Sequence, residues 1–165
     1  MAKQKKILAV ILTLILVLAL MITIFSFSAQ EASTSDRTSG GIVSWVIALL
    51  YPHFGEIPEE EQKQIVHIFS FLVRKCAHLS EYLLLGAALA VHVKAISACW
   101  SLMHPKLLSW LVGTLYAASD ELHQRFVPGR SGEAADVLLD SFGVLLGVLL
   151  VGLIHALWKK RRRDE

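Results

Sequence analysis

Cysteine and charge are both scarce in this chain of 165 residues. The two cysteines, Cys76 and Cys99, do not form a CxxC pair, so neither a zinc site nor a redox motif is indicated. A GxGxxG sequence, a P-loop and internal repeats are also missing. Charged residues make up 18% of the chain and hydrophobic residues 55%, with a mean hydropathy of +0.56. This balance is too apolar for an ordinary soluble domain and is typical of a polytopic membrane protein.

Four apolar stretches are long enough to cross a bilayer as helices. The first, residues 7–27, has about 21 uncharged residues, and about 20 span a hydrocarbon core of roughly 30 Å. A cleavable signal peptide is the alternative, but its apolar region would be shorter, so we predict an uncleaved anchor. The other spans are predicted at about residues 74–94, 106–123 and 134–158. Short connections, one of them turning at Pro128 and Gly129, favour antiparallel neighbours. We therefore predict one all-α membrane domain over residues 1–165, a bundle of four transmembrane helices.

The lysines and arginines are distributed unevenly about these spans. If the N-terminus is inside, ten of the sixteen basic residues lie on the inner side, whereas twelve of the fourteen acids lie elsewhere. This is a positive-inside pattern, so both termini are predicted to be cytoplasmic. Beside a membrane helix, the basic tail is interpreted as an anchor and not as a nucleic-acid patch. The ten residues are Lys3, Lys5, Lys6, Lys94, Lys106, Lys159, Lys160, Arg161, Arg162 and Arg163.

Residues 28–73 are then predicted to lie outside the cytoplasm, as a partly helical segment. The Ser/Thr-rich start is typical of a loop. Residues 42–51 are apolar but too short to span, which favours an interfacial or re-entrant helix. Residues 58–73 have apolar side chains at helical spacing, which predicts a helix lying on the membrane surface. Cys76 and Cys99 fall at opposite ends of a span, so a disulfide between them within one chain is not expected.

Three separate polar stretches reach the same predicted depth, near the outer leaflet. They are residues 74–82, 119–124 and 128–140, and in each the polar side chains recur at helical spacing. Ionisable groups at membrane depth normally face the bundle interior or a wet cavity and pair with one another. We therefore predict one polar cluster made of Arg74, Lys75, His78, Glu81, Tyr82, Asp120, Glu121, His123, Gln124, Arg130, Asp136 and Asp140.

The chemistry of this cluster is open at the level of sequence. Histidine and carboxylate side chains are common metal ligands, and they occur close together here as His78 with Glu81 and as Glu121 with His123, although HExxH is absent. The same groups are suitable for acid–base work, or for an ion-pair network that only holds the helices together. No catalytic residue is assigned, and no cofactor is expected. Below the cluster, the GxxxG of Gly143 and Gly147 predicts close helix packing.

Together these stretches resemble the VanZ-like membrane proteins. The resemblance is carried by FSFSAQEASTSDRTS, which contains the family's FS-x-Q segment, then by RKCAHLSEYLLLG and YAASDELHQRFVPGRSGEAADVLLDSFGVLLG, in that order. The match runs from residue 27 to residue 147. Residues 42–73 match no pattern of the family. The resemblance implies an integral membrane protein of the bacterial cytoplasmic membrane. The founding member of that family is associated with low-level resistance to the glycopeptide teicoplanin, and the resemblance implies no particular reaction.

Three functions are compatible with these residues. In the first, an accessory envelope protein uses Arg74, Lys75 and Arg130 to hold a phosphate or carboxylate of a membrane lipid, a lipid-linked cell-wall precursor or a glycopeptide. The second is an intramembrane hydrolase or transferase acting on a lipid phosphate with a bound metal. The third is a purely structural bundle. No nucleic-acid partner is expected, and the sequence indicates no oligomeric state.

Overall fold

The computed structural model describes residues 2–98 and 102–164, and within these ranges the chain is helical without a strand. This confirms the predicted all-α class. Cys99 lies outside the described residues, so its predicted separation from Cys76 stays a prediction. The elements are α1 (Ala2–Ser28), α2 (Ala32–Leu50), the 3-10 helix η1 (Phe54–Glu56), α3 (Glu59–Ser97), α4 (Pro105–Gln124) and α5 (Ala134–Asp164).

Three of the described helices, α1, α3 and α5, are long and apolar enough to cross a membrane. Large apolar side chains stay exposed along most of α1, as they do where a helix faces lipid. These helices indicate a membrane protein. The helix α4 coincides with the predicted third span, but its polar C-terminal turn leaves it outside this set. The count of four spans and the sidedness of the termini therefore stay predictions.

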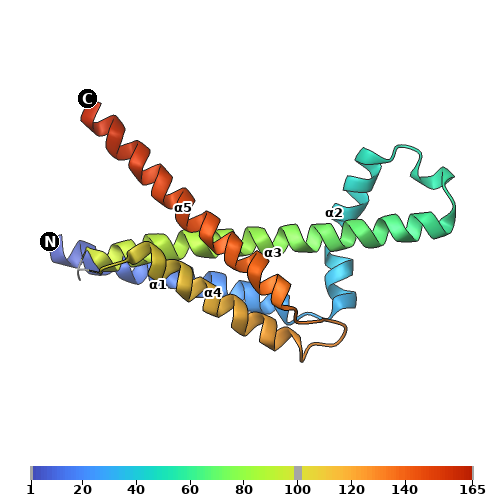
Figure 1. Cartoon of the computed structure of the whole chain (residues 1–165), viewed down its shortest axis with the longest axis horizontal. Helices are drawn as coiled ribbons and strands as arrows, with labels where there is room; N and C mark the ends of the chain where they lie inside the picture. The colour runs from blue at the N-terminus through green and yellow to red at the C-terminus, as the bar shows by residue number, and fades with distance from the viewer. Residues whose placement is uncertain (1, 99–101, 165) are drawn as a thin grey trace.

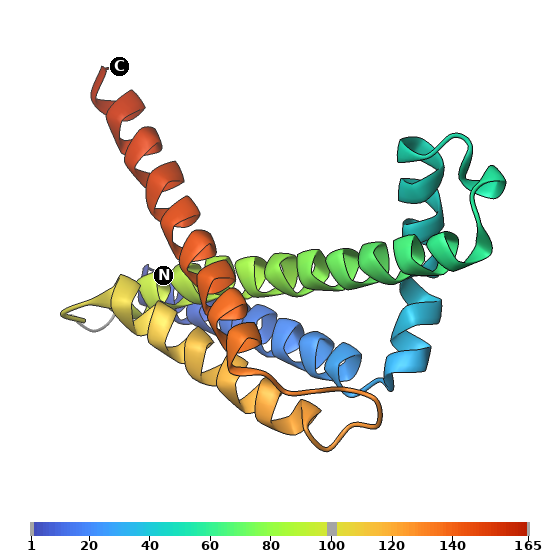
Figure 2. The same ribbon diagram turned by 45° about the vertical axis from the view of Figure 1, so that its right-hand side comes forward.

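The long helix α3 organises the fold (Figure 1). Its C-terminal half packs with α1, α4 and α5, and α5 crosses it obliquely in both views (Figure 2). Its N-terminal half extends beyond this bundle and carries α2 and η1, which together form an arm. The bundle core is made of apolar side chains from four helices: Val17, Ile24, Tyr82, Leu85, Ala88, Leu89, Ala117, Val144 and Val148.

The crossing of α5 over α3 depends on small residues. A Cβ atom on Gly143 would lie 2.8 Å from the Leu79 carbonyl oxygen, and one on Gly147 would lie 2.6 Å from the Ala87 nitrogen. From the other side, a Cβ on Gly86 would lie 2.7 Å from the Val144 Cα. Real Cβ contacts to backbone do not occur at such distances, so the backbones approach as closely as glycine permits.

Two predicted boundaries in the first half of the chain are wrong. We expected a surface helix to end near residue 73 and a span to begin at residue 74, but α3 runs unbroken for 39 residues. No glycine or proline interrupts residues 59–85, and Arg74 and Lys75 stay helical because their charged groups reach a cavity. The Ser/Thr-rich segment predicted to be a loop is helical from Ala32, because α2 packs on α3 and a helix once begun propagates.

Candidate functional site

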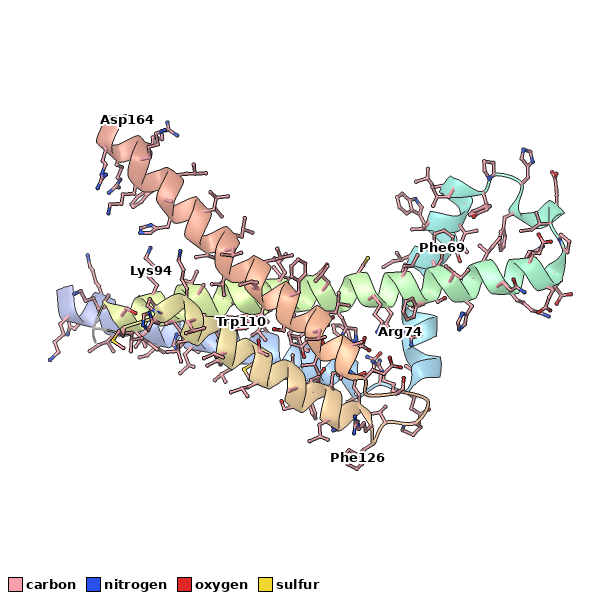
Figure 3. The ribbon with its side chains drawn as sticks, in the orientation of Figure 1. Phe69, Arg74, Lys94, Trp110, Phe126 and Asp164 are labelled. Carbon is pink, nitrogen blue, oxygen red and sulfur yellow. The ribbon has the colours of Figure 1, made fainter. Side chains whose placement is uncertain are left out.

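The predicted polar residues lie where three helices of the bundle have their ends. These are the C-terminal turns of α1 and α4 and the first turns of α5, which all face the middle of α3. Figure 3 shows Arg74 on α3 between the arm and the bundle. Phe126, just beyond α4, points away from the bundle and is 79% exposed. The site is therefore assembled from segments up to about a hundred residues apart in sequence.

A buried hydrogen-bond network joins the end of α1 to the end of α4. The Ser28 hydroxyl donates to Asp120 Oδ2 at 2.6 Å, and Gln124 Nε2 donates to Ser28 Oγ at 2.7 Å. Gln124 also donates to Asp120 Oδ2 at 3.3 Å and to Glu121 Oε1 at 3.4 Å. All four side chains are buried. The network satisfies most of the polar atoms of these side chains, which are costly to bury alone, although Asp120 Oδ1 has no hydrogen-bond partner among the described residues. It also links the two helix ends.

The turn between α4 and α5 positions Arg130. The Arg130 N–H donates to the Val127 carbonyl at 3.2 Å, and Gly129 has φ 75°, which favours glycine at this place of the turn. The guanidinium then reaches the end of α1, with Nη2 donating to the Phe27 carbonyl at 3.1 Å and Nε to the Gln30 carbonyl at 2.8 Å. A cation at a helix C-terminus is favoured because carbonyls there lack partners within the helix.

A cavity of about 460 Å³ opens between α3 and the start of α5. Lys75 forms an ion pair with Asp136 on its wall, and Arg74, the preceding residue on α3, also lines the cavity. Seven of the twelve predicted cluster residues line this cavity: Arg74, Lys75, His78, Gln124, Arg130, Asp136 and Asp140. The wall thus contains three basic side chains, a histidine and three acids, of which Asp136 and Asp140 belong to the predicted cluster and Glu133 does not.

His78, Glu121 and Asp140 converge beneath this cavity from three different helices. One ligand atom of each lies within 4.8 Å of the others, and the two carboxylates are buried. His78 Nδ1 is 3.7 Å from Asp140 Oδ2, and Glu121 Oε2 accepts the Glu133 N–H at 3.2 Å. Within the described part of the chain, neither oxygen of Asp140 has a hydrogen-bond partner.

The remaining predicted residues take other positions. The His123 ring packs on Phe25, with ring centroids 4.6 Å apart. His123 does not belong to the group that converges with His78, whereas Asp140, which was not among the metal candidates, does. Glu81 is half-buried on α3 and also lies outside that group. Tyr82 is wholly buried in the core. Of the four metal candidates chosen from sequence, the structure brings together two.

An apolar groove adjoins the polar cavity. It has a volume of about 1100 Å³ and lies between α2 and the N-terminal half of α3. Val43, Ile47 and Val66 line it, while Phe71, Arg74 and Gly129 line both the groove and the polar cavity. The two spaces therefore share part of their walls. The groove is lined mainly by apolar side chains, although Glu59 and Lys63 also line it, whereas charged side chains predominate in the cavity.

Sequence reasoning missed the contribution of α1. Ser28 is 2% exposed and bonds to both Asp120 and Gln124, and two carbonyls at the end of α1 hold Arg130. The signal was present, because Ser28 and Gln30 belong to the FS-x-Q segment that carries part of the resemblance. It was overlooked because an uncharged serine beside a membrane span is a weak indication of a site.

The fold and the site define an all-helical membrane protein with a polar centre at the helix ends. The chain belongs to the VanZ/LLP1 family, whose sequence profile matches residues 13–155. That range includes α2, α3, α4 and every residue of the predicted cluster. No curated protein and no solved structure matches the chain.

Proposed function

We propose that this protein binds an amphiphile of the bacterial envelope, with its anionic group in the polar cavity and its acyl chain in the adjoining groove. The observation that carries the proposal is the wall shared by the two spaces. A charged cavity alone would suit many anions, and an apolar groove alone would suit many partners. Side by side, they match a molecule with a charged head and an apolar tail.

The charge of the cavity wall supports an anionic head. Arg74, Lys75 and Arg130 all line it, and guanidinium groups bind carboxylates and phosphates through two donors at once. Two of the three acids on the same wall face particular bases, Asp136 facing Lys75 and Asp140 facing His78, and the third, Glu133, accepts a hydrogen bond from the Ser131 hydroxyl. The cavity of about 460 Å³ is within the usual size range of small-molecule sites.

The source of the amphiphile is either a lipid or a drug. An anionic envelope lipid, including a lipid-linked cell-wall precursor, has a phosphate head and a long apolar tail. Teicoplanin also has a fatty acyl chain and acts outside the cytoplasmic membrane. Membership in the VanZ/LLP1 family supports an accessory role in glycopeptide tolerance, exerted at an outward-facing cavity in the cytoplasmic membrane.

The proposal is tested by binding to the full chain in detergent. The lipid arm compares phosphatidylglycerol with phosphatidylcholine of the same acyl chains, and the drug arm compares teicoplanin with a glycopeptide that lacks the acyl chain. In the matching arm, an Arg74→Gln/Arg130→Gln variant should bind about tenfold or more weakly, because charge-assisted hydrogen bonds are lost. Arg125→Gln is the matched control, since Arg125 is exposed and does not line the cavity.

The outcomes separate the two sources. Preference for phosphatidylglycerol that is lost in the double variant identifies a lipid head, and the same pattern with teicoplanin identifies the drug. Equal binding of all probes by wild type and double variant would contradict the proposal. In cells, the double variant should lose glycopeptide tolerance while it is still inserted at wild-type abundance.

A further inference from the structure

We propose that His78, Glu121 and Asp140 bind one divalent cation of the zinc or manganese class, at the base of the polar cavity. The three residues come from α3, α4 and α5, so the site exists only in the folded bundle. It is a different set from the pairs suggested by spacing along the sequence. It does not rest on the binding of an amphiphile.

The state of Asp140 is the first support. Its side chain has no exposed surface, and neither carboxylate oxygen has a hydrogen-bond partner among the described residues. A buried carboxylate without partners is costly unless it is paired, protonated or coordinated to a metal. The base that faces it is His78, whose Nδ1 lies 3.7 Å from Asp140 Oδ2, too far for a hydrogen bond.

The geometry of the three groups is the second support. Their ligand atoms all lie within 4.8 Å of one another. Ligands on a tetrahedral zinc ion lie roughly 3.3 Å apart, since each Zn–N or Zn–O bond is about 2.0 Å. The 3.7 Å between His78 Nδ1 and Asp140 Oδ2 is close to this value, and side-chain rotation would bring the three groups from within 4.8 Å of one another to ligand spacing. One imidazole and two carboxylates are donors that zinc and manganese both accept.

The surroundings of the site hold it in place and leave it open on one side. The Glu133 N–H donates to Glu121 Oε2 and Gln124 donates to Glu121 Oε1, so the carboxylate of Glu121 is oriented. His78 and Asp140 also line the cavity. A cation held by these three protein ligands would keep a coordination position that faces the cavity, available to water or to an anionic oxygen.

The test measures metal in the full chain, purified in detergent without added lipid. The protein is stripped with a chelator, equilibrated separately with Zn²⁺ and Mn²⁺, and analysed by elemental mass spectrometry. Wild type should retain about one ion per chain, and Asp140→Asn should retain less than about a tenth of that. His123→Gln is the matched control, because this histidine is two residues from Glu121 in sequence but outside the group, and it should retain the wild-type amount.

Several results would overturn the proposal. They are wild-type protein that retains neither metal, Asp140→Asn that retains as much as wild type, or His123→Gln that loses the metal as Asp140→Asn does. If Asp140→Asn does not fold, X-ray absorption of the wild-type protein decides. One imidazole with oxygen ligands supports the site, and sulfur or several imidazoles contradict it. Because no lipid or glycopeptide is present, failure here is distinct from failure of the proposed function.

Discussion

The two ends of the helical bundle handle charge in opposite ways. Where α1 and α4 end, the acids Asp120, Glu121 and Asp140 are at most 3% exposed and lie among arginine, lysine, histidine and amide groups. Where α1 begins and α5 ends, basic side chains predominate, and most are exposed. A cavity of about 350 Å³ at that second end has Lys94, Lys106 and Lys159 on its wall. Charged side chains at the first end are stabilised by specific neighbouring groups, whereas those at the second end are stabilised by solvent or by a membrane surface.

This difference teaches which residues tolerate change. A buried polar group is worth little by itself, but removing its partner leaves it unsatisfied at a cost. An exposed lysine has water as an alternative partner. Substitutions matched in chemistry should therefore have different effects at the two ends.

Two glycines of α5 give the largest expected difference. In Gly147→Ala the new Cβ meets the backbone of α3, so the helices must separate, and we expect about 3 kcal/mol of destabilisation. In Gly152→Ala the new Cβ lies 3.1 Å from Lys106 Nζ, the mobile end of a side chain, so stability should be unchanged or slightly higher. Thermal unfolding in detergent compares them. Equal melting temperatures would show that the crossing is not close-packed.

Ser28 gives the next largest effect. Ser28→Ala removes a donor to Asp120 and an acceptor for Gln124 inside the buried network, at an expected cost of about 2 kcal/mol. Ser26→Ala is the matched control on the same helix, since its exposed hydroxyl bonds only to the Ile22 carbonyl. The control should unfold within about 0.5 kcal/mol of wild type. A control as unstable as Ser28→Ala would locate the effect in α1 itself and not in the network.

Arg130→Lys tests whether the planar guanidinium group, and not only the positive charge, is needed at this position. The charge is kept, but a lysine does not reproduce the fork that reaches Phe27, Gln30 and Gln124, so about 1 kcal/mol should be lost. Chemical denaturation in detergent measures the change, with Arg125→Lys as the exposed counterpart. If the two variants are equally stable, the carbonyl contacts at the end of α1 contribute little.

The smallest effect is expected at the other end of the bundle. Lys159→Gln removes an exposed charge from the basic tail, so the free energy of unfolding should change by less than about 0.5 kcal/mol. Thermal unfolding in detergent measures the change. A loss as large as that of Arg130→Lys would remove the contrast between the two ends.

Sequence reasoning predicted much of the fold because apolar length is a strong signal. The ends of α4 and the start of α5 fall within a residue of the predicted limits. The continuity of α3 was missed, because Arg74 and Lys75 were interpreted as marking the membrane boundary, whereas they line an internal cavity. Charge along a sequence does not tell whether a lysine reaches water or a half-buried acid such as Asp136.

The composition of the polar cluster was predictable, but its pairings were not. Helical spacing selects residues that share a face of one helix, and His78 with Glu81 satisfied that criterion. The group that the structure assembles takes one residue from each of three helices, His78, Glu121 and Asp140, so its members are set by how the helices cross. Ser28 joined the site through the same tertiary contacts.

Because α3 is one continuous helix, it sets the distance between the apolar groove and the polar cavity. Val66 in the apolar groove and His78 in the polar cavity lie on one rigid rod, twelve residues apart, which at 1.5 Å per residue is roughly 18 Å. The helix is continuous between the two residues, so this spacing is set by helix geometry. On the proposed function, an amphiphile that fills both spaces would have to place its charged head and the far part of its tail at about this separation, so length as well as charge would decide which ligand binds.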